Sequence, residues 1–299
     1  MPIISVVIPS FNRGHCIRTC IESVLTQTLR DIEVVVVDDA STDDTRDQIA
    51  ALNDSRIRYI PHRTNRGGAA ARNTGISHSE GEFVAFLDSD DYWDATKLQK
   101  QLMLLQEKGD QYGFVYSWFI RKNSAGEELG RDSNSIEGYA LNELLVKNHI
   151  GTFSSVMVRR SVLEAVNGLD EKMKSCQDWD LFIRLSRETQ VCCVEEYLVH
   201  YLQNRHDRYR ISSNPRSIIQ GHKRLLEKIH DDLSGLAVHM RVKALVSFMN
   251  AFIAAGSISD VVRIGIEIMR LELNVASVNV FVLGLLRLAK RRLTQNMGY

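Results

Sequence analysis

Charge of one sign, long apolar runs and patterned cysteines are all missing from this sequence of 299 residues. Lys and Arg number 37 and so do Asp and Glu, so the overall charge gives no argument for binding to nucleic acid or anionic lipid. No uncharged apolar run reaches the length of about 18 residues that a membrane-spanning helix needs, so none is predicted. The N-terminus carries no basic segment ahead of a long apolar one, and no signal peptide is expected.

The cysteines form no CxxC pair and no zinc-binding spacing; they are Cys16, Cys20, Cys176, Cys192 and Cys193. An odd, unpatterned set is typical of reduced thiols in a cytosolic protein, so a cytoplasmic location is expected. Cys16 and Cys20 lie four residues apart on a predicted helix, a spacing that allows a shared metal ion. Burial as small apolar side chains is the favoured interpretation.

The first ninety residues alternate short apolar runs with helical patterns. Strands are predicted at 3–8, 33–37, 56–60 and 83–87, and helices at 17–25, from Ser41 or Thr42 to about 52, and at 68–77. Such alternation predicts right-handed crossovers in an α/β fold. We therefore expect a mostly parallel, Rossmann-like sheet with helices on both faces.

After Trp93 the pattern is less regular. We expect a helix near 98–105, strands at 113–119 and 153–158, a polar loop or hairpin at 121–138, a helix at 178–188 and a hairpin at 191–201. From about Pro215 the chain shows only helical patterns. These features predict a domain of residues 1–214 followed by a helical C-terminal region, 215–299.

Two acid clusters follow predicted strands. Asp38 and Asp39 end one strand, and Asp88, Asp90 and Asp91 follow another. Ligands of open α/β sheets bind outside the carboxyl ends of the strands, so both clusters fall on the ligand edge. Crowded carboxylates suit a divalent cation that also binds substrate phosphates. The alternative is a solvated acidic turn or a helix cap.

These residues belong to segments that resemble the successive motifs of family 2 glycosyltransferases. The segments are "SVVIPSFNR" at 5–13, "VVVVDDASTDDT" at 34–45, "NRGGAAARNTGI" at 65–76, "FLDSDDYW" at 86–93, "SCQDWDLFIRL" at 175–185 and "NRHDRYRIS" at 204–212. The resemblance implies a GT-A type fold and a nucleotide-diphospho-sugar donor. It also implies a nucleotide-binding half, 1–92, and an acceptor half, 93–214.

The resemblance also implies roles for single residues. The residues expected to bind the nucleotide sugar are Pro9, Phe11, Asp38, Asp39, Arg72, Asp88 and Asp91. Of these, Pro9, Phe11 and Asp39 are expected to surround the base, which is expected to be uracil. Asp90 and His206 are expected to hold Mn²⁺ or Mg²⁺. Asp178 matches the acid of the family's Glu-Asp pair and is expected to be the general base, although Gln177 replaces the Glu.

This chemistry suits glycosyl transfer with inversion. A diphosphate leaving group needs positive charge nearby, which Arg72 and a divalent cation would supply. A carboxylate such as Asp178 can accept the proton of the attacking hydroxyl. Taken alone, Asp178 is more often a helix cap and His206 a surface histidine.

Two other functions are kept as alternatives: a sugar-1-phosphate nucleotidyltransferase and a non-catalytic protein that binds sugar nucleotides. The expected acceptor is a saccharide or lipid-linked saccharide, as in bacterial cell-surface polysaccharide synthesis, and no nucleic acid is expected. The segment "SVNVFVLGLLRLAKRRL" at 277–293 joins an apolar stretch to a basic end. It predicts either a packed terminal helix or an interfacial helix at the inner face of the cytoplasmic membrane.

Overall fold

The computed structural model describes residues 1–203, 214–272, 280 and 282–289. They form two compact units. The first is built from Met1–Leu141, His149–Glu171 and Asp178–Tyr209. The second contains the C-terminal helices and two short segments, Asn142–Asn148 and Lys172–Gln177, which lie within the predicted domain of residues 1–214.

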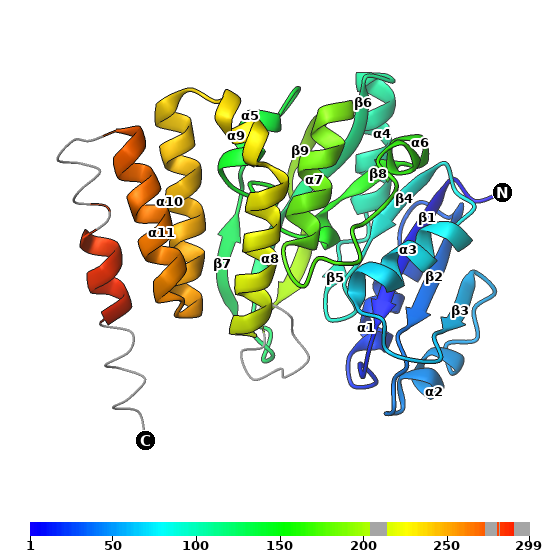
Figure 1. The fold of residues 1–299 in the computed structure, drawn as a ribbon. Helices are drawn as coiled ribbons and strands as arrows, with labels where there is room; N and C mark the ends of the chain where they lie inside the picture. Colours follow the sequence, from blue (N-terminus) through cyan, green and yellow to red (C-terminus); the bar gives the residue numbers. More distant parts are fainter. Residues whose placement is uncertain (204–213, 273–279, 281, 290–299) are drawn as a thin grey trace. The chain divides into compact units, whose positions relative to one another are not determined.

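The first unit is built on one mixed sheet, with strand order β3-β2-β1-β4-β8-β6-β9-β5 and β7 paired to β6. The strands are β1 (Ile4–Ser10), β2 (Ile32–Asp38), β3 (Ile57–Pro61), β4 (Phe83–Phe86), β5 (Tyr92–Trp93), β6 (Tyr112–Lys122), β7 (Glu128–Asp132), β8 (Met157–Arg159) and β9 (Gln190–Leu202). The first four strands are mutually parallel, and they lie side by side in Figure 1. The carboxyl ends of these strands therefore meet at one edge of the sheet.

The helices of the first unit are α1 (Ile17–Leu25), α2 (Thr45–Ala50), α3 (Gly68–His78), α4 (Lys97–Lys108), α6 (Arg160–Ala165) and α7 (Gln177–Glu188), with a 3₁₀ turn η1 at Phe153–Ser155. Alternate residues of β2 show how helices cover both faces of the sheet. Val34 and Val36 pack in the core that contains α1, whereas Val35 and Val37 pack with Ala71 of α3. The predicted α/β sheet with helices on both faces is confirmed.

Three local predictions differ from the structure. The second helix begins at Thr45, because the Asp43 carboxylate accepts hydrogen bonds from the backbone and side chain of Thr45. Segment 153–158 forms η1 followed by the short strand β8. Segment 191–201 is not a hairpin but the middle of β9, which pairs in parallel with β6 along most of its length.

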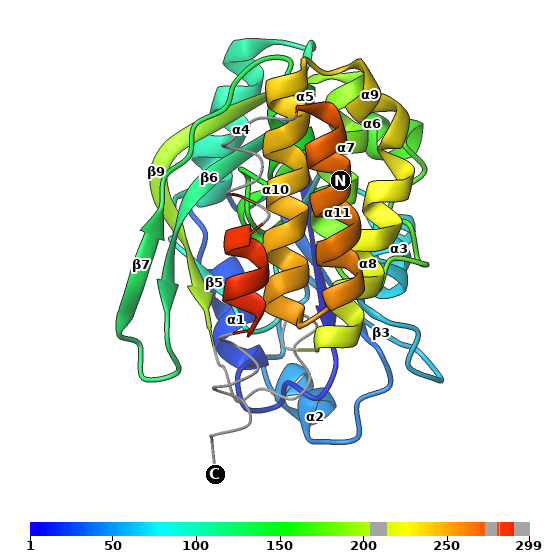
Figure 2. The same cartoon turned by 60° about the vertical axis from the view of Figure 1, so that its left-hand side comes forward.

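The second unit contains α5 (Leu141–Val146), α8 (Pro215–Lys228), α9 (His230–Gly235), α10 (Val238–Ala255) and α11 (Ile258–Leu271). Helix α10 contacts both α8 and α11, which lie on opposite sides of it in Figure 1 and on the same side of it in the turned view of Figure 2. Phe248 and Phe252 of α10 are buried. Among the described residues, α10 alone has the length and apolar composition of a membrane span, with a mean hydropathy of 1.2. That is weak evidence, because core helices of soluble proteins meet the same criterion.

Candidate active site

The two acid clusters lie where the sequence predicts them, at the carboxyl ends of parallel strands. Asp38 is the last residue of β2, and Asp88 follows β4 by two residues. Between these strands, β1 ends at Ser10 and leads into Phe11. Pro9 and Phe11 are both partly exposed. The sheet edge therefore combines apolar and acidic side chains, as a nucleotide site requires.

Asp38 and Asp39 are buried, and their carboxylates are fixed by hydrogen bonds. Asp38 accepts hydrogen bonds from the Ser41 backbone at 2.9 Å and the Tyr59 hydroxyl at 2.6 Å. Burial and the Asp38 carboxylate raise the pKa of Tyr59 well above its ordinary value, so the hydroxyl keeps its proton and remains a donor.

Asp39 organises the turn that begins α3. Its carboxylate accepts the backbone N–H groups of Arg66 at 2.8 Å and Gly67 at 2.7 Å, and it lies 2.7 Å from Nδ1 of His62. Gly67 has a φ of +91°, which glycine adopts without strain. Asp39 thus fixes the start of the helix that carries Arg72. Its expected contact with the base stays a prediction.

The loops after β1 and β2 are joined to each other through Asn12. Its side-chain carbonyl accepts the Thr42 backbone N–H at 2.8 Å, and its own N–H donates to the Ser41 hydroxyl at 2.8 Å. Asn12 has a φ of +52°, a conformation that asparagine tolerates better than most residues. The two loops on the ligand edge are therefore tied to each other by side-chain hydrogen bonds.

Arg72 and Asp88, both expected to bind the donor, form an ion pair. The Arg72 guanidinium also lies 4.1 Å from the ring centroid of Phe153. The arginine side chain is 8% exposed, and the aspartate side chain is 26% exposed. A planar cation held against an aromatic ring can keep a fixed direction toward phosphate.

Asp90 is the other partly exposed acid of the turn after β4, with a side chain that is 26% exposed. Its carboxylate lies 3.9 Å from the guanidinium of Arg13, a residue of the "SVVIPSFNR" segment. The structure therefore brings Arg13 and Arg72 to the same acidic turn. Arg13 was not among the site residues predicted from the sequence.

Asp91 differs from the other two acids of this turn. It is 1% exposed, and its carboxylate accepts hydrogen bonds from the Ser154 hydroxyl at 2.5 Å and the Leu202 backbone at 2.9 Å. Burial, with Asp90 and Asp88 nearby, raises the pKa of Asp91 well above its ordinary value. Through these contacts Asp91 supports the turn, and its expected contact with the donor stays a prediction.

The two N-terminal cysteines contact the same turn. Cys20 donates its S–H to the carbonyl oxygen of Asp88 at 3.6 Å, and Cys16 donates to that of Ser89 at 3.5 Å. Burial raises the pKa of Cys20 well above its ordinary value, so the group stays a neutral thiol. This agrees with the interpretation of Cys16 and Cys20 as packed side chains.

Asp178 lies in the first turn of α7, and its carboxylate accepts the Trp179 backbone N–H at 2.8 Å. The pKa of Asp178 is raised to about 6, and desolvation is the largest cause. The Trp179 N–H and Arg72 act to lower this pKa, whereas Asp88 acts to raise it. The influence of Asp88 and Arg72 shows that the structure brings Asp178 near the donor-side pair. A carboxylate with this pKa is ionised at neutral pH and can still accept a proton.

His206 lies outside the described residues, so its expected part in metal binding stays a prediction. Among the residues that the structure describes, no three His, Cys, Asp or Glu side chains form a cluster that could hold a metal ion. Two partly exposed carboxylates, Asp88 and Asp90, remain at the sheet edge. This oxygen donor set fits a hard divalent ion that completes its coordination with phosphate oxygens and water.

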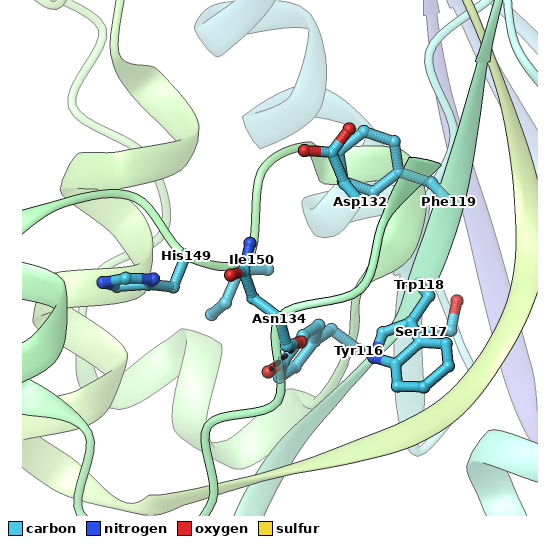
Figure 3. Close-up of a pocket in the computed structure, with 8 residues that line it drawn as sticks. All are labelled: Tyr116, Ser117, Trp118, Phe119, Asp132, Asn134, His149 and Ile150. Atoms are coloured by element: carbon cyan, nitrogen blue, oxygen red, sulfur yellow. Dashed lines mark hydrogen bonds between the residues drawn. The ribbon is translucent and has the colours of Figure 1, made fainter. Parts of the chain in front are cut away.

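A small hollow lies on the first unit beside β6. Its lining is drawn in Figure 3 and comprises Tyr116, Ser117, Trp118, Phe119, Asp132, Asn134, His149 and Ile150. The space amounts to about 140 Å³ even when open solvent is included. Pockets for small molecules usually measure at least about 300 Å³, so this hollow does not compete with the sheet edge as a donor site.

Curated relatives share sequence with part of the chain. It is 38% identical over 122 residues to the UDP-Glc:alpha-D-GlcNAc-diphosphoundecaprenol beta-1,3-glucosyltransferase WfgD of Escherichia coli, a match that covers 41% of this chain and 48% of the relative. It is 36% identical over 162 residues to the putative teichuronic acid biosynthesis glycosyltransferase TuaG of Bacillus subtilis, covering 53% and 63%. The match to WfgD thus spans about half the length of that relative.

Solved structures share the fold across most of the chain. Residues 1–349 of S. aureus TarS in complex with UDP-GlcNAc align with a TM-score of 0.60 and 18% identity, covering 86% of this chain and 83% of TarS 1–349. The mannosyltransferase PcManGT of Pyrobaculum calidifontis, in complex with GDP-Man and Mn²⁺, aligns with a TM-score of 0.60 and 16% identity, covering 98% and 87%. At these identities the likeness concerns the fold, which is the expected GT-A type.

The family is established by a match to a family model. Residues 5–166, more than half of the chain, match the model described as glycosyl transferase family 2. The matched region contains both acid clusters and Arg72. This chain belongs to glycosyl transferase family 2.

Proposed function

We propose that this chain transfers a sugar, with inversion, from a nucleotide-diphospho-sugar to a hydroxyl of a saccharide or lipid-linked saccharide. The observation that carries the proposal is the convergence of Arg72, Asp88 and Asp178 at one edge of the sheet. We propose that the first two bind the diphosphate of the donor. Asp178 is the carboxylate with a pKa suited to accept the acceptor's proton.

The proposed steps use the chain's own residues. Phe153 holds the Arg72 guanidinium in place, so that it can contact the diphosphate as negative charge develops there. Asp178 then takes the proton of the acceptor hydroxyl as its oxygen attacks the anomeric carbon and the nucleoside diphosphate leaves. One direct displacement without an enzyme nucleophile inverts the anomeric configuration.

We further propose that transfer needs Mn²⁺ or Mg²⁺, held by Asp90 and, by resemblance, His206. A divalent cation supplies positive charge to the diphosphate when it is bound. The Mn²⁺ in the PcManGT complex supports this proposal. Asp90 is suited to the role because its side chain is partly exposed at the sheet edge.

A UDP-sugar donor and a role in bacterial cell-surface polysaccharide synthesis are proposed from the relatives. WfgD is named for a UDP-glucose donor and a lipid-linked acceptor, and TuaG for teichuronic acid biosynthesis. TarS was solved with UDP-GlcNAc. The PcManGT complex contains GDP-Man, so donors of both nucleotide types need to be tested.

A transfer assay with D178N tests the proposed base. We expect nucleotide diphosphate release and sugar transfer to fall by about 10²-fold or more, as for removal of a general base. Asp47 also lies in the first turn of a helix and is exposed, so D47N is the matched control and should keep activity. Unchanged transfer by D178N would show that the base lies elsewhere.

The product and a chelator separate this proposal from its alternatives. A nucleotidyltransferase would release pyrophosphate, and a non-catalytic binding protein would release nothing. A glycosyltransferase releases the nucleoside diphosphate. Treatment with EDTA should abolish transfer, and Mn²⁺ should restore it; transfer that persists in EDTA would exclude the metal requirement.

We also propose that the C-terminal chain contacts the inner face of the cytoplasmic membrane, where lipid-linked acceptors are located. Residues 282–289 are helical, and Val282, Leu283 and Leu286 are exposed on them. The sequence continues with Lys290, Arg291 and Arg292. Exposed apolar side chains followed by basic ones are typical of a helix that binds an anionic membrane surface.

A further inference from the structure

One serine hydroxyl contacts two parts of the acidic turn that follows β4. The Ser154 hydroxyl, in η1, donates to the Asp91 carboxylate at 2.5 Å and accepts the Asp88 backbone N–H at 3.1 Å. Ser154 is fully buried. A hydroxyl has one proton to donate and lone pairs to accept with, so both contacts can be made together.

These two contacts fix the turn at both ends. The Leu87 N–H donates to the Val7 carbonyl of the neighbouring strand at 3.1 Å, whereas the next N–H, that of Asp88, donates to Ser154. The Asp91 N–H donates to the Asp88 carbonyl at 2.9 Å and closes the turn. Asp90 lies between the two anchored residues, so its direction depends on both anchors.

Ser154 is itself held by contacts from other elements. The Trp93 indole N–H donates to the Ser154 carbonyl at 2.8 Å, and the Thr152 hydroxyl accepts the Ser154 N–H at 3.3 Å. The Gln101 side chain donates to the carbonyl of Ser155 at 2.8 Å. A hydroxyl held in this way can impose a position on its partners.

The same 3₁₀ turn also reaches the cationic side of the site. Phe153, the residue before Ser154, lies under the Arg72 guanidinium. Its ring contacts Phe182 of α7, the helix that begins at Gln177 and carries Asp178, with centroids 5.9 Å apart. Two neighbouring residues of η1, Phe153 and Ser154, therefore contact the acidic turn, the arginine and the helix of the proposed base.

We propose that Ser154 is a positioning residue for the donor site, whose hydroxyl sets the direction in which Asp88 and Asp90 meet the cation and the diphosphate. The proposal rests on the function proposed above. Groups that orient metal-binding side chains typically change metal affinity or activity by about 10- to 100-fold when they are removed. We expect a loss of that size for S154A.

The chain offers a matched control in the adjacent residue. Ser155 is also fully buried, but its hydroxyl donates to the Thr152 carbonyl at 2.8 Å and not to an acid of the turn. S155A removes the same atom from the same 3₁₀ turn. A loss caused only by packing would therefore appear in both variants.

The experiment measures the binding of Mn²⁺ alone, the binding of UDP in the presence of Mn²⁺, and kcat and KM for sugar transfer in the full chain. We expect S154A to weaken Mn²⁺ binding by about 10- to 100-fold and to raise KM for the donor, with S155A close to the wild type. Equal losses in S154A and S155A, or unchanged Mn²⁺ binding in S154A, would overturn the proposal.

Two further variants keep the test decisive if S154A does not fold. The threonine of S154T and the valine of S154V have nearly the same shape as each other, but only threonine keeps the hydroxyl. S154T should therefore bind Mn²⁺ more tightly than S154V. Equal Mn²⁺ affinities in this pair would also overturn the proposal. If the wild type binds Mn²⁺ but neither binds UDP nor transfers sugar, the proposed function fails, while the Mn²⁺ measurement still decides the role of Ser154.

Discussion

Asp178 is subject to opposing influences on its charge. Its place in the first turn of α7 and the N–H of Trp179 favour the ionised carboxylate, as expected for a helix N-terminus. Desolvation opposes ionisation and is the largest influence, so the pKa of Asp178 rises to about 6. A base with a pKa just below the working pH combines the correct charge with a useful affinity for the proton.

The pH dependence of transfer follows from this value. Below pH 6 the protonated Asp178 cannot accept a proton, so kcat/KM should fall about tenfold for each unit of pH. A plot of kcat/KM against pH should therefore show an acidic limb with an apparent pKa of about 6. A limb near the ordinary value for aspartate, 3.8, would contradict the assignment.

The raised pKa also has a cost in stability. A carboxylate whose pKa is higher in the folded than in the unfolded state destabilises the fold at pH 7, and this cost disappears as the pH falls through about 6 toward the ordinary value. D178N carries no charge and should unfold at a higher temperature than the wild type at pH 7. Because Asp178 is partly exposed, we expect a gain of about 1 kcal/mol in unfolding free energy.

Calorimetry at two pH values checks this stability effect. The difference in melting temperature between D178N and the wild type should be larger at pH 7 than at pH 5, where the wild-type carboxyl is mostly protonated. A lower melting temperature for D178N at pH 7 would show that hydrogen bonding of the carboxylate outweighs its desolvation.

At the scale of elements, α3 depends on a close approach to β1. A Cβ atom added to Gly75 would lie 2.3 Å from Cγ1 of Val7, so alanine cannot enter unless the Val7 side chain, the helix or the strand moves. We expect G75A to lower the unfolding free energy by about 1–3 kcal/mol, as for other overpacked cores. Since α3 also carries Arg72, the affinity for UDP should fall as well.

Gly235 supplies the control for this change. It ends α9, and a Cβ there would have no atom within 4 Å. Because alanine favours helices, G235A should leave the melting temperature unchanged or slightly raised. Denaturant unfolding of both variants checks the prediction, and equal stability of G75A and wild type would show that α3 can shift at no cost.

Elements that depend on local pattern were predictable from the sequence, and those that depend on distant partners were not. The apolar run before Asp88 predicts β4 and the acidic turn because both signals are local. The single strand β9 was missed because its pairing with β6 joins segments far apart in the chain. Ser154 was missed for the same reason, since it meets Asp91 across 63 positions.

At the scale of the whole molecule, the proposed membrane contact can be tested by flotation. The chain of residues 1–299 should float with vesicles that contain anionic phospholipid, and L283E/L286E should lose this binding because charge replaces exposed apolar side chains. Leu129 on β7 is exposed to a similar extent, so L129E is the control and should still float. Equal flotation of both variants would remove the C-terminal helix as the anchor.

The joined loops after β1 and β2 have a thermodynamic consequence for donor capture. Because Asn12 ties the first loop to Ser41 and Thr42, the conformational entropy of both loops is lost during folding. A nucleotide that arrives at this edge therefore has less of the loops left to order, which lowers the entropy penalty of binding. We therefore expect that the ordering of these two loops does not limit the rate of nucleotide association, which should depend on diffusion and local charge.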